Sequence, residues 1–162
     1  MAKQVKPIPE GYHTVTPYLA VQDGAQAIDF YKRAFGAKEV MRSAGPDGKL
    51  SHAEIKIGDS IIMLGGMTSA ELRAPQSLGA STVSIFLYLD NVDATFQQAL
   101  SAGAKVTQPL ADMFWGDRYG RLTDPFGHSW SLAQHIEDVA PAEMEKRAKE
   151  AMAQQQQQRA HA

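Results

Sequence analysis

The pair His52 and Glu54 is the first candidate for chemistry in this sequence. Residues two apart in a strand point to the same face, so the imidazole and the carboxylate would lie side by side, with about 6–7 Å between their Cβ atoms. Such a pair could move protons, because histidine titrates near neutral pH and a carboxylate orients it. It could also give a divalent metal two ligands, which is fewer than a complete set. A third interpretation is a polar, hydrogen-bonded wall of a binding site.

Aromatic and cationic side chains form the second set of candidates. Phe86 and Tyr88 share one face of a segment whose side chains alternate between two faces, and Tyr18 lies on the corresponding face of the alternating segment 14–21. Trp115 could stack on a planar ligand and Arg118 could clamp an anionic one, but Trp115 could equally pack its own loop and Arg118 pair with an aspartate. The functional interpretation predicts a ligand site formed by Tyr18, His52, Glu54, Phe86, Tyr88, Trp115 and Arg118.

Two modules of β-α-β-β-β type are expected to position these residues. Asp23-Gly24 and Gly36 mark the start and end of the first helix, and Asp90-Asn91 and Gly103 those of the second. Between and beyond the helices, strand patterns alternate with turn residues. The expected division is a first module at 13–65, a linker at 66–81, a second module at 82–136, a C-terminal helix at 137–153 and a disordered Gln-rich tail at 154–162.

An internal repeat supports this division. Val15-Thr16-Pro17-Tyr18-Leu19 aligns with Val83-Ser84-Ile85-Phe86-Leu87, and Gly36-Ala37-Lys38 aligns with Gly103-Ala104-Lys105. A module of this kind leaves one sheet face bare and cannot bury it alone, so two copies are expected to pair.

The amino-acid composition excludes several classes of protein. The 162 residues include no cysteine, which excludes a disulfide framework, a thiolate nucleophile and a Cys-ligated metal. The net charge of -2, with scattered basic residues, predicts no nucleic-acid partner, and no apolar run approaches the roughly 20 residues of a membrane span. The first residues lack the apolar segment of a signal peptide, so a cytoplasmic location is expected.

Several motifs together resemble one family. They are His52-Ala53-Glu54-Ile55, Trp115-Gly116-Asp117-Arg118 and Asp124-Pro125-Phe126-Gly127-His128-Ser129-Trp130, set within the two repeated modules. In this respect the chain resembles the vicinal oxygen chelate superfamily of glyoxalase I, bleomycin-resistance proteins and extradiol dioxygenases, and its PhnB-like branch most of all. The resemblance implies an α+β fold in which curled mixed sheets surround a cup. It also implies a homodimer, because the cup often forms between the halves of two chains.

The resemblance further implies where a metal would bind. Metal-dependent members hold one divalent ion with His or Gln on the first strand of each half and Glu on the last. Carried over to this chain, these positions fall on Thr16, Ser84, Ser131 and a residue near Ile62. None offers an imidazole or a carboxylate, whereas the lyase and dioxygenase reactions need the ion as a Lewis acid. We therefore expect no metal and no cofactor at these positions, and a divalent metal only if it is displaced toward His52 and Glu54.

Two functional hypotheses follow. The first is a metal-independent protein of the bleomycin-resistance type, which sequesters or carries an amphipathic, partly aromatic small molecule rather than acting as an enzyme. The second is a lyase, isomerase or dioxygenase that uses a displaced divalent metal, or His52 and Glu54 as an acid–base pair. Both predict a small-molecule ligand, and neither predicts a nucleic-acid or membrane partner.

Overall fold

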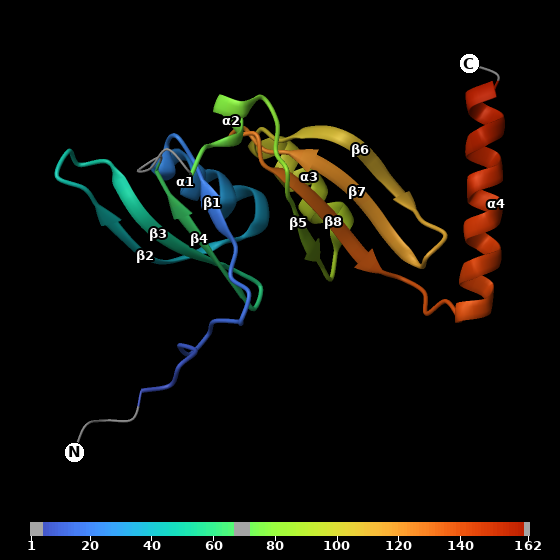
Figure 1. The fold of residues 1–162 in the computed structure, drawn as a ribbon, viewed down its shortest axis with the longest axis horizontal. Helices are drawn as coiled ribbons and strands as arrows, with labels where there is room; N and C mark the ends of the chain where they lie inside the picture. The colour runs from blue at the N-terminus through green and yellow to red at the C-terminus, as the bar shows by residue number, and fades with distance from the viewer. Residues whose placement is uncertain (1–4, 67–71, 161–162) are drawn as a thin grey trace.

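The computed structural model describes residues 5–66 and 72–160, and it consists of two α+β modules side by side (Figure 1). The first contains β1 (Tyr18–Ala20), α1 (Gly24–Phe35), β2 (Lys38–Ala44), β3 (Leu50–Ile57) and β4 (Ser60–Gly65). The second contains β5 (Ser84–Tyr88), α3 (Val92–Ala102), β6 (Lys105–Asp112), β7 (Asp117–Thr123) and β8 (Ser129–His135). The strand orders, β1-β4-β3-β2 and β5-β8-β7-β6, are equivalent, with one parallel pair in each sheet. The expected fold class is confirmed.

The two long helices begin and end where capping residues predict. The Asp23 side chain accepts a hydrogen bond from the backbone N–H of Gln26 at 3.0 Å, and the Asn91 side chain does the same for Ala94. Gly36 and Gly103 end the helices with positive φ angles of 64° and 116°, which glycine adopts without strain.

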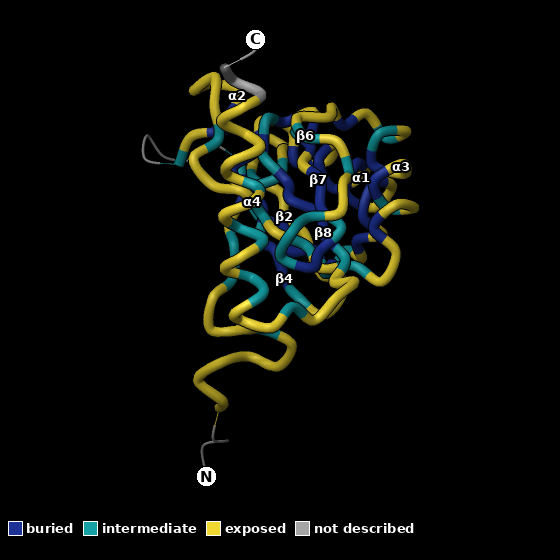
Figure 2. The backbone as a smooth tube through the Cα atoms, turned by 90° about the vertical axis from the view of Figure 1, so that its right-hand side faces the viewer, coloured by how far each residue is buried: buried dark blue, intermediate teal, exposed yellow. Residues whose placement is uncertain are grey.

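The hydrophobic core lies between the helices and one face of each sheet (Figure 2). Helices α1 and α3 pack against each other and so join the modules. Trp130 of β8 is fully buried, with its ring centroid 4.5 Å from that of Phe35 and 5.3 Å from that of Tyr31. Aromatic side chains of the first module therefore pack directly on the second, and this contact fixes the relative positions of the two sheets.

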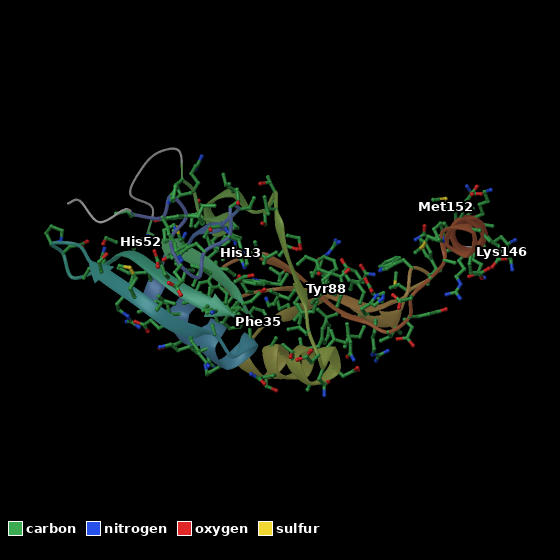
Figure 3. All side chains as sticks on the ribbon, turned by 90° about the horizontal axis from the view of Figure 1, so that it is seen from below. His13, Phe35, His52, Tyr88, Lys146 and Met152 are labelled. Atoms are coloured by element: carbon green, nitrogen blue, oxygen red, sulfur yellow. The ribbon has the colours of Figure 1, made fainter. Side chains whose placement is uncertain are left out.

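In the part of the chain that the structure describes, no helix lies over the other face of either sheet (Figure 1). Figure 3 shows His52 and Tyr88 on this side of their sheets, whereas Phe35 lies on the helix side. Phe86 and Tyr88 are 47% and 65% exposed there. We call these two uncovered surfaces the open faces of the first and second sheets.

The segments outside the modules differ from the expected division. The linker contains a short helix, α2 (Pro75–Leu78), and its residues 67–71 lie outside the described part of the chain. Helix α4 spans Pro141–Ala160 and stands apart from the sheets (Figure 1), so the Gln-rich stretch expected to be disordered is helical as far as Ala160. Glutamine has a favourable helix propensity, which accounts for the continuation. Residues 161 and 162 of the expected tail are not described.

None of the helices in the described ranges is long and apolar enough to cross a membrane.

Candidate functional site

Glu54 is the centre of a polar network on the open face of the first sheet. It lies on β3 and is 7% exposed. One carboxylate oxygen accepts a hydrogen bond from the Tyr12 hydroxyl, and the other lies 3.2 Å from Nε2 of His52. The hydrogen bond to Glu54, together with desolvation, raises the pKa of Tyr12. The expected His–carboxylate pair is therefore joined by a tyrosine from the segment that precedes β1.

Tyr18 completes this network from the neighbouring side. Its hydroxyl is 3.4 Å from Nδ1 of His52, and the two ring centroids are 5.7 Å apart. Gly65 of β4 makes this placement possible, because a Cβ atom there would lie 2.1 Å from the Tyr18 hydroxyl oxygen. The ring consequently crosses β4 over a glycine and reaches the histidine on β3.

A cavity of about 460 Å³ opens beside this network, between the N-terminal segment and the first sheet. Pro7, Ile8 and Tyr12 form one side, and Glu54 and Met63 form the other. Its size is in the range of small-molecule sites, and it combines apolar walls with one buried carboxylate.

An aromatic floor covers part of the open face of the second sheet. Phe86 lies nearly parallel to Tyr119, with centroids 5.7 Å apart, and its centroid is 5.0 Å from that of Tyr88. Trp115 meets Tyr119 edge-on at 5.8 Å. We define the aromatic floor as Phe86, Tyr88, Trp115 and Tyr119. Tyr119 is buried and stacks against Phe86, whereas Phe86 and Tyr88 are exposed and form a surface suited to a planar apolar group.

Asp117 holds one end of the aromatic floor in place. This carboxylate at the start of β7 is 3% exposed and accepts hydrogen bonds from the Tyr88 hydroxyl and from Trp115 Nε1, both at 3.0 Å. It also lies 2.8 Å from Nδ1 of His135, whose Nε2 is 3.0 Å from Asp138. The hydrogen bond to Asp117, and then that to Asp138, raises the pKa of His135 above 6.5. The bond to Asp117 likewise raises the pKa of Tyr88.

Hydroxyl groups line the opposite end of the same face. Ser131 Oγ is 3.0 Å from Ser84 Oγ and 3.1 Å from the Tyr119 hydroxyl, and the Ser129 hydroxyl donates to Ser84 Oγ at 3.1 Å. Arg121 Nη2 donates to the Tyr119 hydroxyl at 2.9 Å. We call Ser84, Ser129, Ser131 and Tyr119 the hydroxyl row.

Arg118 is not brought together with the other predicted site residues. Its neighbours Asp117 and Tyr119 point to the open face, so alternation directs Arg118 to the helix side. There its guanidinium donates to Asp93 of α3 at 2.7 Å and to Asp112 of β6 at 2.9 Å. Carboxylates occupy both sides of its guanidinium, so Arg118 is not available to a ligand on the open face.

The carried-over metal positions contain no strong metal ligand. Ile62 is buried on the helix side, and the residue of β4 that faces Glu54 is Met63, so the expected position shifts by one residue. With Thr16, Ser84 and Ser131, the set offers hydroxyls and a thioether in place of imidazole and carboxylate. In the described residues, no group of three or more His, Asp or Glu side chains is placed to hold a metal ion. These residues do not fit the divalent ion of metal-dependent relatives.

Four residues that sequence reasoning missed contribute to the two open faces, Tyr12 to the first and the other three to the second. Asp117, Tyr119 and Arg121 alternate along β7, and this period-two pattern could have placed all three on one face. Tyr12 had no such signal, because it lies outside regular structure and meets Glu54 from 42 residues away.

A family model, a related sequence and two solved structures each match most of this chain. The family model described as the glyoxalase/bleomycin resistance protein/dioxygenase superfamily matches residues 12–132. The uncharacterised protein Mb0911c of Mycobacterium bovis is 49% identical over 129 residues, which cover 77% of this chain and 85% of that protein. Among solved structures, TioX from Micromonospora sp. ML1 has a TM-score of 0.62 at 26% identity, covering 76% of this chain and 99% of that one. The bleomycin resistance determinant encoded on transposon Tn5 has a TM-score of 0.57 at 26% identity, covering 76% and 98%.

Proposed function

The chain belongs to the glyoxalase/bleomycin resistance protein/dioxygenase superfamily, and we propose that it is a metal-independent small-molecule binding protein. Its ligand is amphipathic and partly aromatic, and the protein sequesters or carries it rather than transforming it. The ligand contacts are Tyr18, His52 and Glu54 from the first sheet, Phe86 and Tyr88 from the second, and Trp115 from the turn between β6 and β7.

The exposed aromatic floor is the observation that carries this proposal. Large aromatic side chains are normally buried, yet Phe86 and Tyr88 present 47% and 65% of their surface to solvent on an uncovered sheet face. Clusters of this kind mark interaction sites. Asp117 holds Tyr88 and Trp115 in fixed positions, so the floor is organised before a ligand arrives and loses little conformational entropy on binding.

Metal independence is supported by the chemistry of the donor set. Thr16, Met63, Ser84 and Ser131 provide neutral, weak ligands at the positions where metal-dependent members use His and Glu. In this proposal the polar groups orient the ligand through hydrogen bonds, without a Lewis acid.

A homodimer is part of the proposal. Each chain leaves an open face on both of its sheets, and pairing of two copies would cover the first sheet of one with the second sheet of the other. A closed two-fold arrangement forms two equivalent cups in this way. Sedimentation at micromolar concentration is expected to give twice the chain mass of 17.6 kDa. A mass near that of one chain would contradict this part of the proposal.

Calorimetric titration with naphthalene carboxamide, a neutral planar probe, tests the binding function. We expect saturable binding, and a loss of about tenfold or more in affinity for Phe86→Ala, because removing the ring forfeits roughly 1.5–3 kcal/mol of apolar contact. Val106→Ala is the matched control: Val106 is also an exposed apolar residue, but its partner Leu122 is buried on the helix side. Equal effects of the two substitutions would show that the probe does not bind on the aromatic floor.

The hydrogen-bonded contact of Tyr12, Glu54 and His52 favours one alternative, an enzyme that uses His52 as an acid–base group oriented by Glu54. A lyase or isomerase of this kind would exchange the proton next to a carbonyl. Deuterium incorporation into an aryl α-hydroxyketone, followed by NMR, tests it: exchange that disappears in both His52→Ala and Glu54→Gln supports the enzyme. Exchange that persists in both variants contradicts it.

A further inference from the structure

The open face of the second sheet carries an arginine that has no acidic partner among the residues that the structure describes. Arg121 lies on β7 next to Ser131 of β8, and its side chain is exposed. Its one hydrogen bond to a side chain in the described residues is to the neutral Tyr119 hydroxyl. Arg118 on the same strand is, by contrast, held by two carboxylates on the other face. A guanidinium has five N–H donors, so most of those on Arg121 remain available to a ligand.

The hydroxyl row has a donor to spare as well. Its three hydroxyl–hydroxyl contacts can use three of the four hydroxyl hydrogens, whichever way each contact is directed. The fourth hydrogen can point to an acceptor outside the row when it lies on Ser84, which is exposed, whereas Ser131 and Tyr119 are buried. Serine, threonine and arginine donors together form a group that complements an oxygen-rich anion.

A cavity of about 450 Å³ lies at this end of the face. Arg121, Thr123 and Ser129 line it from the sheet, and the segment that contains α2 lines it from the other side. Within the described ranges its lining includes no carboxylate, so nothing in it repels an anion. The aromatic floor begins immediately beside it, because Phe86 pairs in register with Ser131 and stacks on Tyr119.

We propose that Arg121 and the hydroxyl row bind the oxyanion of a ligand whose aromatic part lies on the floor. The inference rests on the proposed binding function and narrows it: the ligand is an aromatic or planar molecule that carries a carboxylate or phosphate group. Arg121 supplies the charge and a planar pair of donors, while the hydroxyls donate hydrogen bonds to the oxygens of the anion. Tyr119 belongs to both parts, since its buried ring stacks against Phe86 of the floor and its hydroxyl accepts a hydrogen bond from the guanidinium.

Three naphthalene probes of similar shape test the inference by calorimetric titration: the carboxylate, the phosphate ester and the neutral carboxamide. The protein is expected to bind at least one anionic probe about tenfold to a hundredfold more tightly than the carboxamide, since charge-assisted hydrogen bonds are worth about 1.5–3 kcal/mol. Whether the carboxylate or the phosphate ester binds more tightly identifies the oxyanion. In Arg121→Gln the preference is expected to vanish while carboxamide affinity changes less than about twofold. Because Arg121 is exposed, the variant should keep the melting temperature of the parent protein.

Arg118→Gln is the matched control, because it removes an arginine from the same strand on the opposite face. It should retain the preference for the anionic probe. A preference lost in Arg118→Gln but kept in Arg121→Gln would overturn the inference, as would equal affinity of the parent protein for charged and neutral probes. In the latter case binding of the carboxamide would leave the proposed function standing. Absence of binding by all three probes would overturn both.

Discussion

Replacement of Tyr31 by Phe tests the contact that joins the two modules. The Tyr31 hydroxyl of α1 donates to Oδ2 of Asp124 at 2.8 Å, across 93 residues of sequence. The same oxygen accepts from Trp130 Nε1 at 2.8 Å, and Oδ1 accepts from the backbone N–H groups of Phe126 and His128, each at 2.9 Å. Asp124 is 4% exposed, so these four donors replace its water shell. Burial, and then the charge of Asp124, raises the pKa of Tyr31 well above 10.0.

The size of the effect follows from this geometry. Tyr31→Phe removes one hydrogen bond to a charged acceptor and changes the packing by a single oxygen, so it should lower the free energy of unfolding by about 1.5–3 kcal/mol. Asp124→Asn keeps the shape but has one acceptor oxygen for four donors. Two donors then face an amide NH₂ group, and at about 1–3 kcal/mol for each unsatisfied donor the loss should be roughly 2–6 kcal/mol. Since both substitutions break the same contact, their effects should be less than additive.

Urea unfolding followed by circular dichroism at one fixed protein concentration measures these losses. Tyr88→Phe is the matched control, because Tyr88 also donates to an aspartate but is 65% exposed. Its effect should stay within about 0.5 kcal/mol, as for most surface substitutions. If Tyr31→Phe were no more destabilising than Tyr88→Phe, the contact at Asp124 would not be holding the modules together.

Three further predictions concern the site. Protein purified without a chelator or an affinity tag should contain well under one equivalent of divalent metal per chain by elemental analysis. One tightly held ion per chain would contradict metal independence and would make His52 and Glu54 its candidate ligands. NMR titration should give His135 a pKa above 6.5, and Asp117→Asn should return this pKa toward 6.5. Because the pKa of His135 is higher in the folded than in the unfolded state, the pair contributes its full stability at acidic pH, and this stability is lost as the pH rises through the folded-state pKa. In fluorotryptophan-labelled protein, naphthalene carboxamide should shift the fluorine signal of Trp115 on the aromatic floor and leave that of the buried Trp130 in place, whereas a shift confined to Trp130 would argue against the proposed site.

Local patterns predicted the elements that have strong local signals. The caps at Asp23 and Asn91 and the glycines at 36 and 103 identified both long helices, because capping depends on residues within one turn. Alternation in β5 correctly placed Phe86 and Tyr88 together on the face away from the helices, since a strand has a period of two.

Features that depend on register or on distant contacts were not predictable in this way. Arg118 was expected at the ligand, but β7 begins at Asp117, so Arg118 points to the helix side. A one-residue change in the repeat likewise moves the metal-ligand position expected on β4 from Ile62 to Met63. One residue of register reverses the face of a side chain, and sequence alignment of the halves does not resolve so small a shift.

Tyr31 also shows how the two halves have diverged. Their backbones are equivalent in strand order and pack through equivalent helices, as expected after duplication of a single module. Counted from the helix caps Asp23 and Asn91, the counterpart of Tyr31 in α3 is Ala99, which has no hydroxyl to give. The bond that joins the halves thus runs in one direction only, from the first half to the second. In the first half, the turn between β3 and β4 contains Asp59, whose side chain is 88% exposed and accepts from Ser60 instead of from a helix. A tandem of two second halves would therefore lack the tyrosine donor, and in a tandem of two first halves the aspartate of this turn would not be buried against the helices.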